Sequence, residues 1–263
     1  MKINHKIVDI LKARAFMDPP FNDGYKIAVV LPGGIMSGIT VAGAMIALEE
    51  LGLSNAIDVG DVASCGFPNL SYLLSKQSEY GSTIYAEELS GGSFINFLRL
   101  IVLKSPVDYD WAVKSVHDLK PLNHLKIWES HTNILLRLKN NYGKVVYLEP
   151  KDFDPSEYFS FFKASISQPI ISKGAVIEGK RYFDGQFGQA DLNDHIRRAL
   201  ERDYTHIVII YNRSDQRKLI LPPSDRILEI VPDVSVRAFE TRPLQLFHSR
   251  DEMRKKVLNL FSH

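Results

Sequence analysis

The chain has 263 residues, of which 45% are hydrophobic and 24% are charged, and its formal net charge is +1. This length can bury a substantial core in one large domain, and a charge near zero argues against a nucleic-acid partner, which normally needs a basic surface. The single cysteine, Cys65, excludes an intrachain disulfide and most cysteine-based metal sites.

Charged residues interrupt the N-terminal segment MKINHKIVDILKARAF, so it lacks the apolar stretch of a secretory signal peptide. The chain also has no run of about 18 uncharged apolar residues, which a membrane-spanning helix would need. We therefore expect a soluble protein of the reduced cytoplasm.

The first part of the chain alternates strand and helix patterns. A β-branched run at 26–32 (KIAVVLP) predicts a buried strand, and Gly33-Gly34 follows it directly. Gly52 ends the first predicted helix, and Pro68 falls in the first turn of the second, where proline is tolerated. This alternation is typical of a parallel α/β sheet. The predicted elements are strands at 26–32 and 56–63 and helices at 39–51 and 67–76.

The middle of the chain, about 82–141, is mostly helical in pattern and shows no clear strand, so we interpret it as a helical insertion that caps the sheet. Strand and helix patterns then resume, with a hairpin that turns at Gly179-Lys180. The C-terminal helix sets apolar residues beside a charged face, which is usual for a packed surface helix and occasional for a membrane-docking one. The predicted elements are strands at 144–149 and 205–212, a hairpin at 175–185, and helices at 156–168, 192–202 and 244–261.

No repeat, low-complexity tract or linker divides the sequence, so we predict one domain over 1–263. The segments with motifs lie between about 26 and 211, and a C-terminal strand and helix occupy 218–263.

A serine stands at the junction of the second strand and helix. The segment Val62-Ala63-Ser64-Cys65-Gly66 is close to G-x-S-x-G, the pattern of a nucleophile on a sharp strand-to-helix turn, with valine in place of the first glycine. The pattern is weak by itself, because small residues often flank buried serines. We expect the Cys65 side chain to point away from the site and to act as a small buried hydrophobe.

Two further motifs could supply what a serine nucleophile needs. The loop GGIMSG, from Gly33 to Gly38, follows the first strand and would present backbone N–H groups to an anion or a developing oxyanion. It fits a dinucleotide fingerprint badly in spacing, although Asp58 lies where a ribose-binding acid could be. Asp184-Gly185 ends an apolar strand; such a pair most often marks a plain turn, but here it could provide a base.

Together these motifs resemble the patatin-like phospholipase family, whose pattern is G-G-G-x-R/K-G, then G-x-S-x-G, then D-G-G or D-G-A. The similarity includes GAMIALEELGL in the first helix, Asn69 after the elbow, ASISQPI before the Asp-Gly pair and ALERDYTHIVII after it, and it covers most of 26–211. The chain is most similar to the small single-domain bacterial members. The resemblance implies a three-layer α/β sandwich with a mostly parallel central sheet and a helical cap.

The resemblance also implies a chemistry. Ser64 would attack the carbonyl of a lipid acyl ester, Asp184 would accept its proton, and water or another acceptor would resolve the acyl-enzyme. It implies no metal or cofactor and a phospholipid or lysophospholipid substrate. The helical cap and the basic amphipathic C-terminal helix predict peripheral contact with a lipid surface. The implied oxyanion hole comprises Gly33, Gly34, Ile35 and Gly38, chiefly through the N–H groups of Gly34 and Ile35. The implied supporting residues of the elbow and loops are Val62, Gly66 and Gly185.

Four positions depart from the family pattern, namely Ile35, Ser37, Val62 and Gln186. Ile35 keeps its N–H, but a β-branched residue disfavours positive φ, so we expect its N–H to be misaimed. An acyltransferase that uses the same acyl-enzyme, and a catalytically degenerate lipid- or protein-binding module, are therefore alternative functions.

An α/β-hydrolase triad is a further alternative, because the order Ser64, Asp184 and a later histidine fits it. The candidate histidines are His195, His206 and His248. None has a motif around it, and His195 lies in a polar helix, where we expect a surface residue. The dyad is the better prediction.

Overall fold

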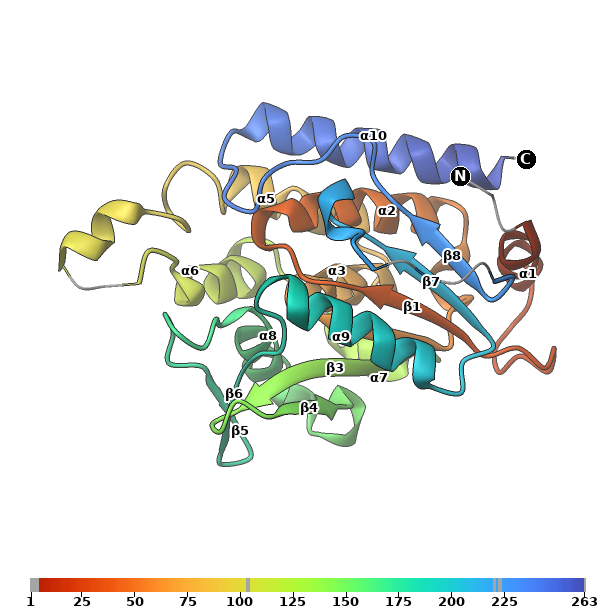
Figure 1. The fold of residues 1–263 in the computed structure, drawn as a ribbon, viewed down its shortest axis with the longest axis horizontal. Helices are drawn as coiled ribbons and strands as arrows, with labels where there is room; N and C mark the ends of the chain where they lie inside the picture. The colour runs from red at the N-terminus through yellow and green to blue at the C-terminus, as the bar shows by residue number, and fades with distance from the viewer. Residues whose placement is uncertain (1–4, 103–104, 220, 222–223, 263) are drawn as a thin grey trace.

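A central sheet of eight strands lies at the middle of the protein (Figure 1). The computed structural model describes residues 5–102, 105–219, 221 and 224–262. The strands are β1 (Ile27–Leu31), β2 (Val59–Ala63), β3 (Asn133–Asn140), β4 (Val145–Leu148), β5 (Ala175–Ile177), β6 (Lys180–Asp184), β7 (His206–Ile210) and β8 (Ile227–Ile230). Their order is β5-β6-β3-β2-β1-β7-β8, with β4 paired to β3 outside this path. The run from β3 to β8 is parallel, and β4, β5 and β6 pair antiparallel.

Helices cover both faces of this sheet. The helices are α1 (His5–Arg14), α2 (Gly38–Glu50), α3 (Gly66–Leu74), α4 (Ser78–Ser82), α5 (Ile84–Glu87), α6 (Tyr109–Lys114), α7 (Leu125–Glu129), α8 (Tyr158–Ile166), α9 (Gly188–Glu201) and α10 (Pro243–Phe261). Short helical turns are η1 (Ile35–Ser37), η2 (Leu53–Asn55), η3 (Phe97–Val102), η4 (Ser115–Leu119), η5 (Pro150–Asp152), η6 (Pro155–Glu157) and η7 (Ser214–Gln216).

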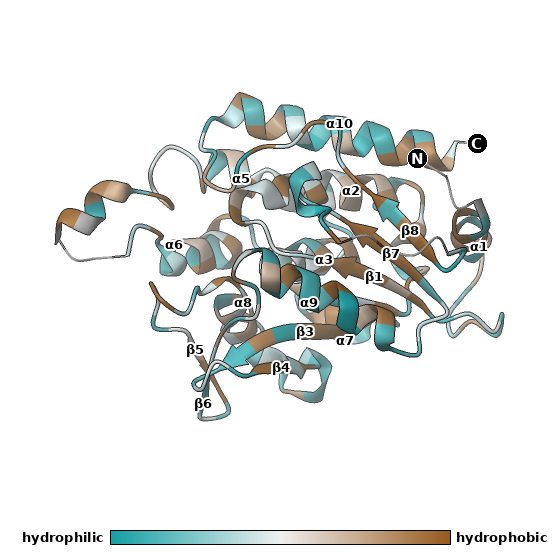
Figure 2. Cartoon of the chain, viewed as in Figure 1, coloured by the Kyte–Doolittle hydropathy of each residue, from teal (hydrophilic) through white to brown (hydrophobic). Residues whose placement is uncertain are grey.

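Strand alternation divides the core between the two faces. In β1, Ile27, Val29 and Leu31 pack into a large cluster with α2, α3, α8 and α10, whereas Ala28 and Val30 pack against α9 on the other face. Both faces are covered, so all five residues are buried and the strand is continuously apolar (Figure 2). Helix α10 lies along α2 and leaves α2 buried on all sides from its start to Leu48. This is the expected three-layer α/β arrangement.

Most predicted elements are confirmed to within a few residues, and two predictions were wrong. The segment 82–141 is helical only as far as Glu129, because β3 follows as a central strand between β2 and β6. Arg137 and Lys139 hid the strand pattern, since charges are rarely buried in a sheet unless they are paired. The hairpin turns at Glu178-Gly179, both at positive φ, and not at Gly179-Lys180, because Ile177 pairs with Lys180.

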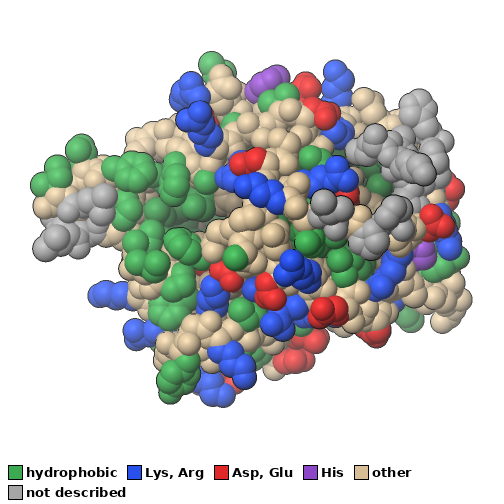
Figure 3. Space-filling model, viewed as in Figure 1, with side chains coloured by type: hydrophobic (Ala, Val, Ile, Leu, Met, Phe, Trp, Pro, Cys, Tyr) green, Lys and Arg blue, Asp and Glu red, His purple; other side chains and the backbone are tan. Residues whose placement is uncertain are grey.

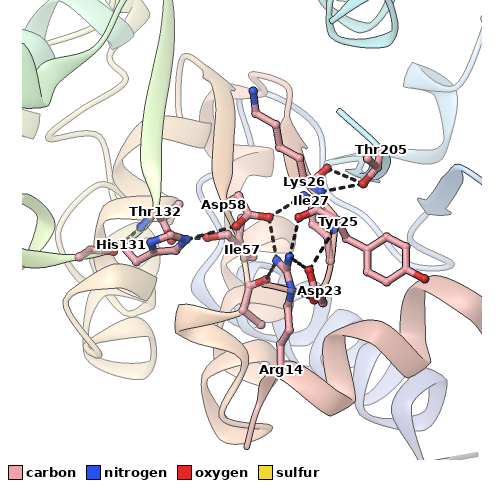
Figure 4. Close-up of polar contacts among 12 residues, drawn as sticks. Arg14, Asp23, Tyr25, Lys26, Ile27, Ile57, Asp58, His131, Thr132 and Thr205 are labelled. Carbon is pink, nitrogen blue, oxygen red and sulfur yellow. Dashed lines mark hydrogen bonds and ion pairs between the residues drawn. The ribbon is translucent and has the colours of Figure 1, made fainter. Parts of the chain in front are cut away.

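A buried arginine fixes the N-terminal helix to the sheet (Figure 4). The guanidinium of Arg14 donates to Asp23 at 2.7 Å and to Asp58 at 2.7 Å, and it lies 4.2 Å from the ring centre of Phe21. Asp58 also accepts from the backbone N–H of Ile27 at 2.7 Å. Its carboxylate is therefore occupied at the amino end of β2, the opposite end from the elbow, and this geometry does not support a ribose-binding role.

Candidate active site

The strand register brings three loops together at one edge of the sheet. β3 lies between β2 and β6, with Ala63 opposite Arg137 and Leu138 opposite Asp184. Neighbouring strands are spaced about 4.8 Å apart, so the backbones at Ser64 and Asp184 are roughly 10 Å apart across the end of β3. Two side chains that converge over this strand can meet, and the loop after β1 lies beside them.

Ser64 occupies a strained turn between β2 and α3. Its φ is +53°, a left-handed conformation that is rare for serine and typical of functional turns. The turn needs close packing, because a Cβ at Gly66 would lie 2.4 Å from the carbonyl oxygen of Leu31 and a Cβ at Gly33 would lie 2.4 Å from the Cβ of Ser64. Val62 is buried in the core and does not prevent the turn. The elbow predicted from sequence is therefore present in the structure.

The glycine loop forms beside the serine, and here the prediction for Ile35 was wrong. Ile35 does adopt positive φ, at +53°. Ser37 is buried, and its hydroxyl donates to the carbonyl oxygen of Gly34 at 2.6 Å, so this serine braces the loop where the family pattern has a basic residue. The left-handed conformation of Ile35 costs about 1–2 kcal/mol, and the loop holds it within an otherwise well-bonded turn.

The N–H groups of the loop differ in availability. Gly33 donates to Oε1 of Gln186 at 3.1 Å, and Gly38 donates back to the carbonyl of Ile35 as α2 begins. Within the described ranges, the N–H groups of Gly34 and Ile35 have no oxygen acceptor and face the thiol of Cys65. This narrows the predicted oxyanion donors to Gly34 and Ile35.

Hydrogen bonds from these two N–H groups lower the pKa of the neighbouring Cys65 thiol. Burial and the charge of Asp184 outweigh them and raise this pKa to about 12. Cys65 is buried as expected, but it lines the same cavity as Ser64 and does not point away from the site. With that pKa, the thiol stays protonated near neutral pH, which does not suit a thiolate nucleophile.

Asp184 is fully buried at the end of β6. Its Oδ1 accepts from the backbone N–H of Gln186 at 2.8 Å, and its Oδ2 accepts from Nε2 of Gln168 at 2.6 Å. Burial raises the pKa of Asp184 to about 7, although hydrogen bonds from the Gln186 N–H and the Ser64 hydroxyl favour the charged form. The carboxyl is therefore close enough to Ser64 for the hydroxyl to affect its pKa, and it is partly ionised at neutral pH.

Side-chain amides hold the loops, and sequence analysis missed most of them. Nε2 of Gln186 donates back to the carbonyl of Gly33 at 3.2 Å, and Nε2 of Gln216 donates to the same oxygen at 2.9 Å. Asn212 Nδ2 donates to the carbonyl of Pro32 at 2.6 Å. Gln186 was visible only as a departure from a pattern, whereas Gln216, 30 residues further on, gave no signal.

Arg137, on β3, holds the Asp-Gly loop through a hydrogen bond to its backbone. Its side chain is fully buried, Nε donates to the carbonyl of Gly185 at 3.0 Å, and a terminal nitrogen lies 2.8 Å from Asp194. A buried guanidinium is stable only with such partners. The charge that hid β3 in the sequence therefore positions the loop that follows Asp184.

A cavity of about 570 Å³ opens over Ser64 and is lined mainly by apolar side chains. Representative lining residues are Met36, Leu89, Phe94, Val107, Phe162 and Ile166. Arg213, Asp215 and Lys218 also line it, and Arg213 is paired with Asp215 at 2.8 Å, so the net positive charge at this part of the wall comes from Lys218. Such a cavity suits a long apolar chain joined to a small polar group.

Among the residues that the structure describes, no histidine forms a triad with Ser64. No histidine of the described residues lines the cavity. His195 is not the surface residue expected but is fully buried, with Nε2 2.8 Å from the equally buried Asp61 of β2, which needs a partner there. His206 begins β7, as its strand pattern predicted, and His248 is exposed on α10.

Across the described part of the chain, no three His, Cys, Asp or Glu side chains gather in a way that could hold a metal ion. The helices in that part are also too short or too polar to cross a bilayer.

No protein-family model matches the sequence, and no curated protein matches it. Solved structures do match the fold. VipD from Legionella pneumophila is 13% identical, with a TM-score of 0.52 over 90% of this chain and 67% of VipD. The human GIVD cytosolic phospholipase A2, in complex with a methyl gamma-linolenyl fluorophosphonate inhibitor and terbium chloride, is 9% identical, with a TM-score of 0.52 over 98% of this chain and 63% of the human one. The chain thus spans about two thirds of the length of either protein.

These likenesses confirm the patatin-like α/β fold predicted from the sequence motifs, with a mostly parallel sheet and helices around it.

The left-handed conformation of Ile35 predicts an inverted order of stabilities. Glycine is normally the worse replacement, but at positive φ it avoids a cost of about 1 kcal/mol that alanine retains. We expect Ile35→Gly to unfold at a higher urea concentration than Ile35→Ala, although both lose the packing of the half-buried isoleucine. The reverse order would show that Ile35 does not hold this conformation in solution.

Proposed function

We propose that the protein is a serine acyl hydrolase that cleaves lipid acyl esters through Ser64 and Asp184. The observation that carries this proposal is a strained, buried serine beside a carboxyl of raised pKa at the floor of an apolar cavity. Strained left-handed residues and perturbed carboxyls both concentrate at active sites. The likeness to a human phospholipase A2 fold supports the same class of reaction.

In the proposed first step, Oγ of Ser64 attacks the ester carbonyl while its proton passes to Asp184. The carbonyl oxygen becomes an oxyanion, and the N–H groups of Gly34 and Ile35 donate to it. When the intermediate collapses, the bond to the leaving alcohol breaks and Asp184 returns the proton to that alcohol. An acyl group remains on Ser64.

The second step reverses these roles with water. Asp184 takes a proton from water, whose oxygen attacks the acyl carbonyl, and the same two N–H groups again stabilise the oxyanion. The fatty acid leaves and Ser64 recovers its proton from Asp184. The apolar cavity wall would hold the acyl chain throughout, since burying it removes apolar surface from water.

The cavity mouth also favours contact with a lipid surface. Large apolar side chains are exposed around it and on the protruding η3 segment, as Figure 3 shows at the left of the view. Phe187 and Phe239 line the cavity and are about half exposed, at 53% and 49%. The ring of Phe239 lies 5.9 Å from that of Phe97 in η3, so the exposed patch is continuous with the mouth. The members of this apolar collar are Phe97, Leu98, Ile101, Ile170, Ile171, Phe187 and Phe239.

We expect a fluorophosphonate probe to label the wild type at Ser64 and to leave Ser64→Ala unmodified, as peptide mass mapping would establish. Asp184→Asn should cut ester hydrolysis by at least about 10³-fold, because the serine then has no acceptor for its proton. His248→Gln, which changes an exposed residue on α10, is the matched control and should retain activity within about tenfold, or 1.4 kcal/mol in barrier. Folded protein that takes up no label at long times would contradict the hydrolase proposal.

The pH dependence should follow the ionisation of Asp184. Because the base must be ionised, kcat/KM should rise about tenfold per pH unit below the midpoint near 7 and then level off, a gain of about a hundredfold from pH 5 to pH 8. Lys139 lowers the pKa of Asp184 and Asp191 raises it.

Lys139 and Asp191 form an ion pair at 2.6 Å, and replacing either residue tests whether Asp184 is the titrating base. The two replacements should shift the pH midpoint in opposite directions. Lys139→Met should move the midpoint of the pH profile upwards, and Asp191→Asn should move it downwards. If both variants left the midpoint unchanged, Asp184 would not be the group that titrates.

Sedimentation with anionic liposomes should recover the protein, and less of it at high salt, because salt screens surface charge. The double variant Leu98→Asp and Ile101→Asp should weaken this association at least tenfold, since each side chain contributes about 1.5–3 kcal/mol when buried in an apolar phase. Tyr142→Asp, at a 94% exposed residue outside the apolar collar, should have little effect. Equal loss in both proteins would argue against docking through the collar.

A further inference from the structure

Two polar groups inside the cavity have no hydrogen-bond partner among the described residues. They are the hydroxyl of Tyr109 and Oε1 of Gln168. The two residues are only 8% and 7% exposed, so bulk water does not cover these groups. Several other buried side-chain atoms lack partners in the described part, but none belongs to a residue that lines the cavity. Buried polar groups without partners are costly and rare, so a pair of them beside Ser64 points to a ligand.

The orientation of Gln168 determines what that ligand must offer. Its Nε2 donates to Oδ2 of Asp184 at 2.6 Å, so the amide cannot turn without losing this bond. Oε1 is therefore held on the other side of the amide, and it can only accept. A partner for Gln168 must carry an O–H or N–H.

Tyr109 supplies the complementary group. Burial raises the pKa of its hydroxyl, so this hydroxyl stays protonated and can donate. Tyr109 begins α6, which packs against α8, and Gln168 lies just beyond the end of α8, so both residues line the cavity from neighbouring elements. The backbone N–H of Gln168 also acts on the pKa of the Tyr109 hydroxyl, in agreement with this placement. An acceptor and a donor thus lie side by side at the reaction centre.

We propose that Tyr109 and Gln168 form a subsite for a free hydroxyl group next to the scissile ester of the substrate. The hydroxyl donates to Oε1 of Gln168 and accepts from the hydroxyl of Tyr109. The inference rests on the proposed function and narrows the substrate class to monoacyl esters of a polyol. A diacyl lipid carries a second ester at that position, which can only accept and leaves Gln168 unpaired.

The subsite predicts a substrate preference that one missing oxygen removes. We expect wild-type kcat/KM for 2,3-dihydroxypropyl decanoate to exceed that for 3-hydroxypropyl decanoate by about ten- to a hundredfold. The latter compound lacks the 2-hydroxyl, so it leaves the Tyr109 hydroxyl and Oε1 of Gln168 unpaired. Both esters are supplied below their critical micelle concentrations. Tyr109→Phe should bring the ratio to within about threefold of one.

Tyr85→Phe is the matched control. Tyr85 lines the same cavity, but its hydroxyl already donates to Oδ1 of Asn69 at 3.3 Å. This variant should keep the wild-type ratio. A wild-type ratio near one, or equal loss of the ratio in both tyrosine variants, would overturn the subsite.

A second pair of esters identifies the source of the hydroxyl. In 1-decanoyl-lysophosphatidylcholine and its analogue without the 2-hydroxyl, a phosphocholine group replaces the terminal hydroxyl. A hydroxyl preference in both pairs assigns the subsite to lysophospholipids as well as monoacylglycerols, and a preference in the neutral pair alone assigns it to monoacylglycerols. Both results support the subsite.

Binding to Ser64→Ala separates the subsite from catalysis. Calorimetry with the neutral pair should show the same preference for the hydroxyl compound in this variant, which cannot form an acyl-enzyme. If the preference in binding is present but the wild type hydrolyses neither ester, the proposed function fails and the subsite stands. If the wild type hydrolyses both esters and neither affinity nor kcat/KM depends on the hydroxyl, the subsite fails and the proposed function stands.

Discussion

The backbone N–H and the backbone carbonyl of Gly33 are both held by one side chain. Its N–H donates to Oε1 of Gln186 and its carbonyl accepts from Nε2 of the same amide, at 3.1 and 3.2 Å. Gln186 follows the Asp-Gly pair, so this pair of hydrogen bonds joins the loop after β1 to the loop after β6. Gly33 in turn touches Ser64 so closely that a Cβ would not fit. The proposed nucleophile, its proposed base and the proposed N–H donors are thereby held as one unit.

This bond changes the meaning of a departure from the family pattern. A glycine or alanine after Asp-Gly cannot reach across the site, whereas glutamine can. The N–H of Gly33 is consumed by that contact, and the next two N–H groups, of Gly34 and Ile35, remain available. The strained φ of Ile35 is consistent with a loop whose path is set by bonds on either side of it. Gln186, which in the sequence looks like the loss of a family residue, thus holds the two loops together in the structure.

The elements that sequence analysis placed correctly are those with local signals. Apolar runs predicted β1 and β2, and the small residues around Ser64 predicted the elbow. β3 was missed because the partner of Arg137 is Asp194, 57 residues later, and nothing local shows that its charge is neutralised. His195 was misplaced for the same reason, since its partner Asp61 lies 134 residues away. Local pattern predicts the apolar strands and the position of the turn at Ser64, but buried polar pairs depend on the completed fold.

The burial of Asp184 also determines how the fold responds to acid. The carboxyl has a pKa near 3.9 in an unfolded chain and about 7 in the folded protein, which therefore holds the proton more tightly. The contribution of this group to the free energy of unfolding is fully present below about pH 4 and is lost as the pH rises to about 7. The ionisation that weakens the fold is the one that creates the proposed base. For this carboxyl, mild acid favours a more stable protein in which the proposed base is protonated. At neutral pH the base becomes available and part of that stability is lost.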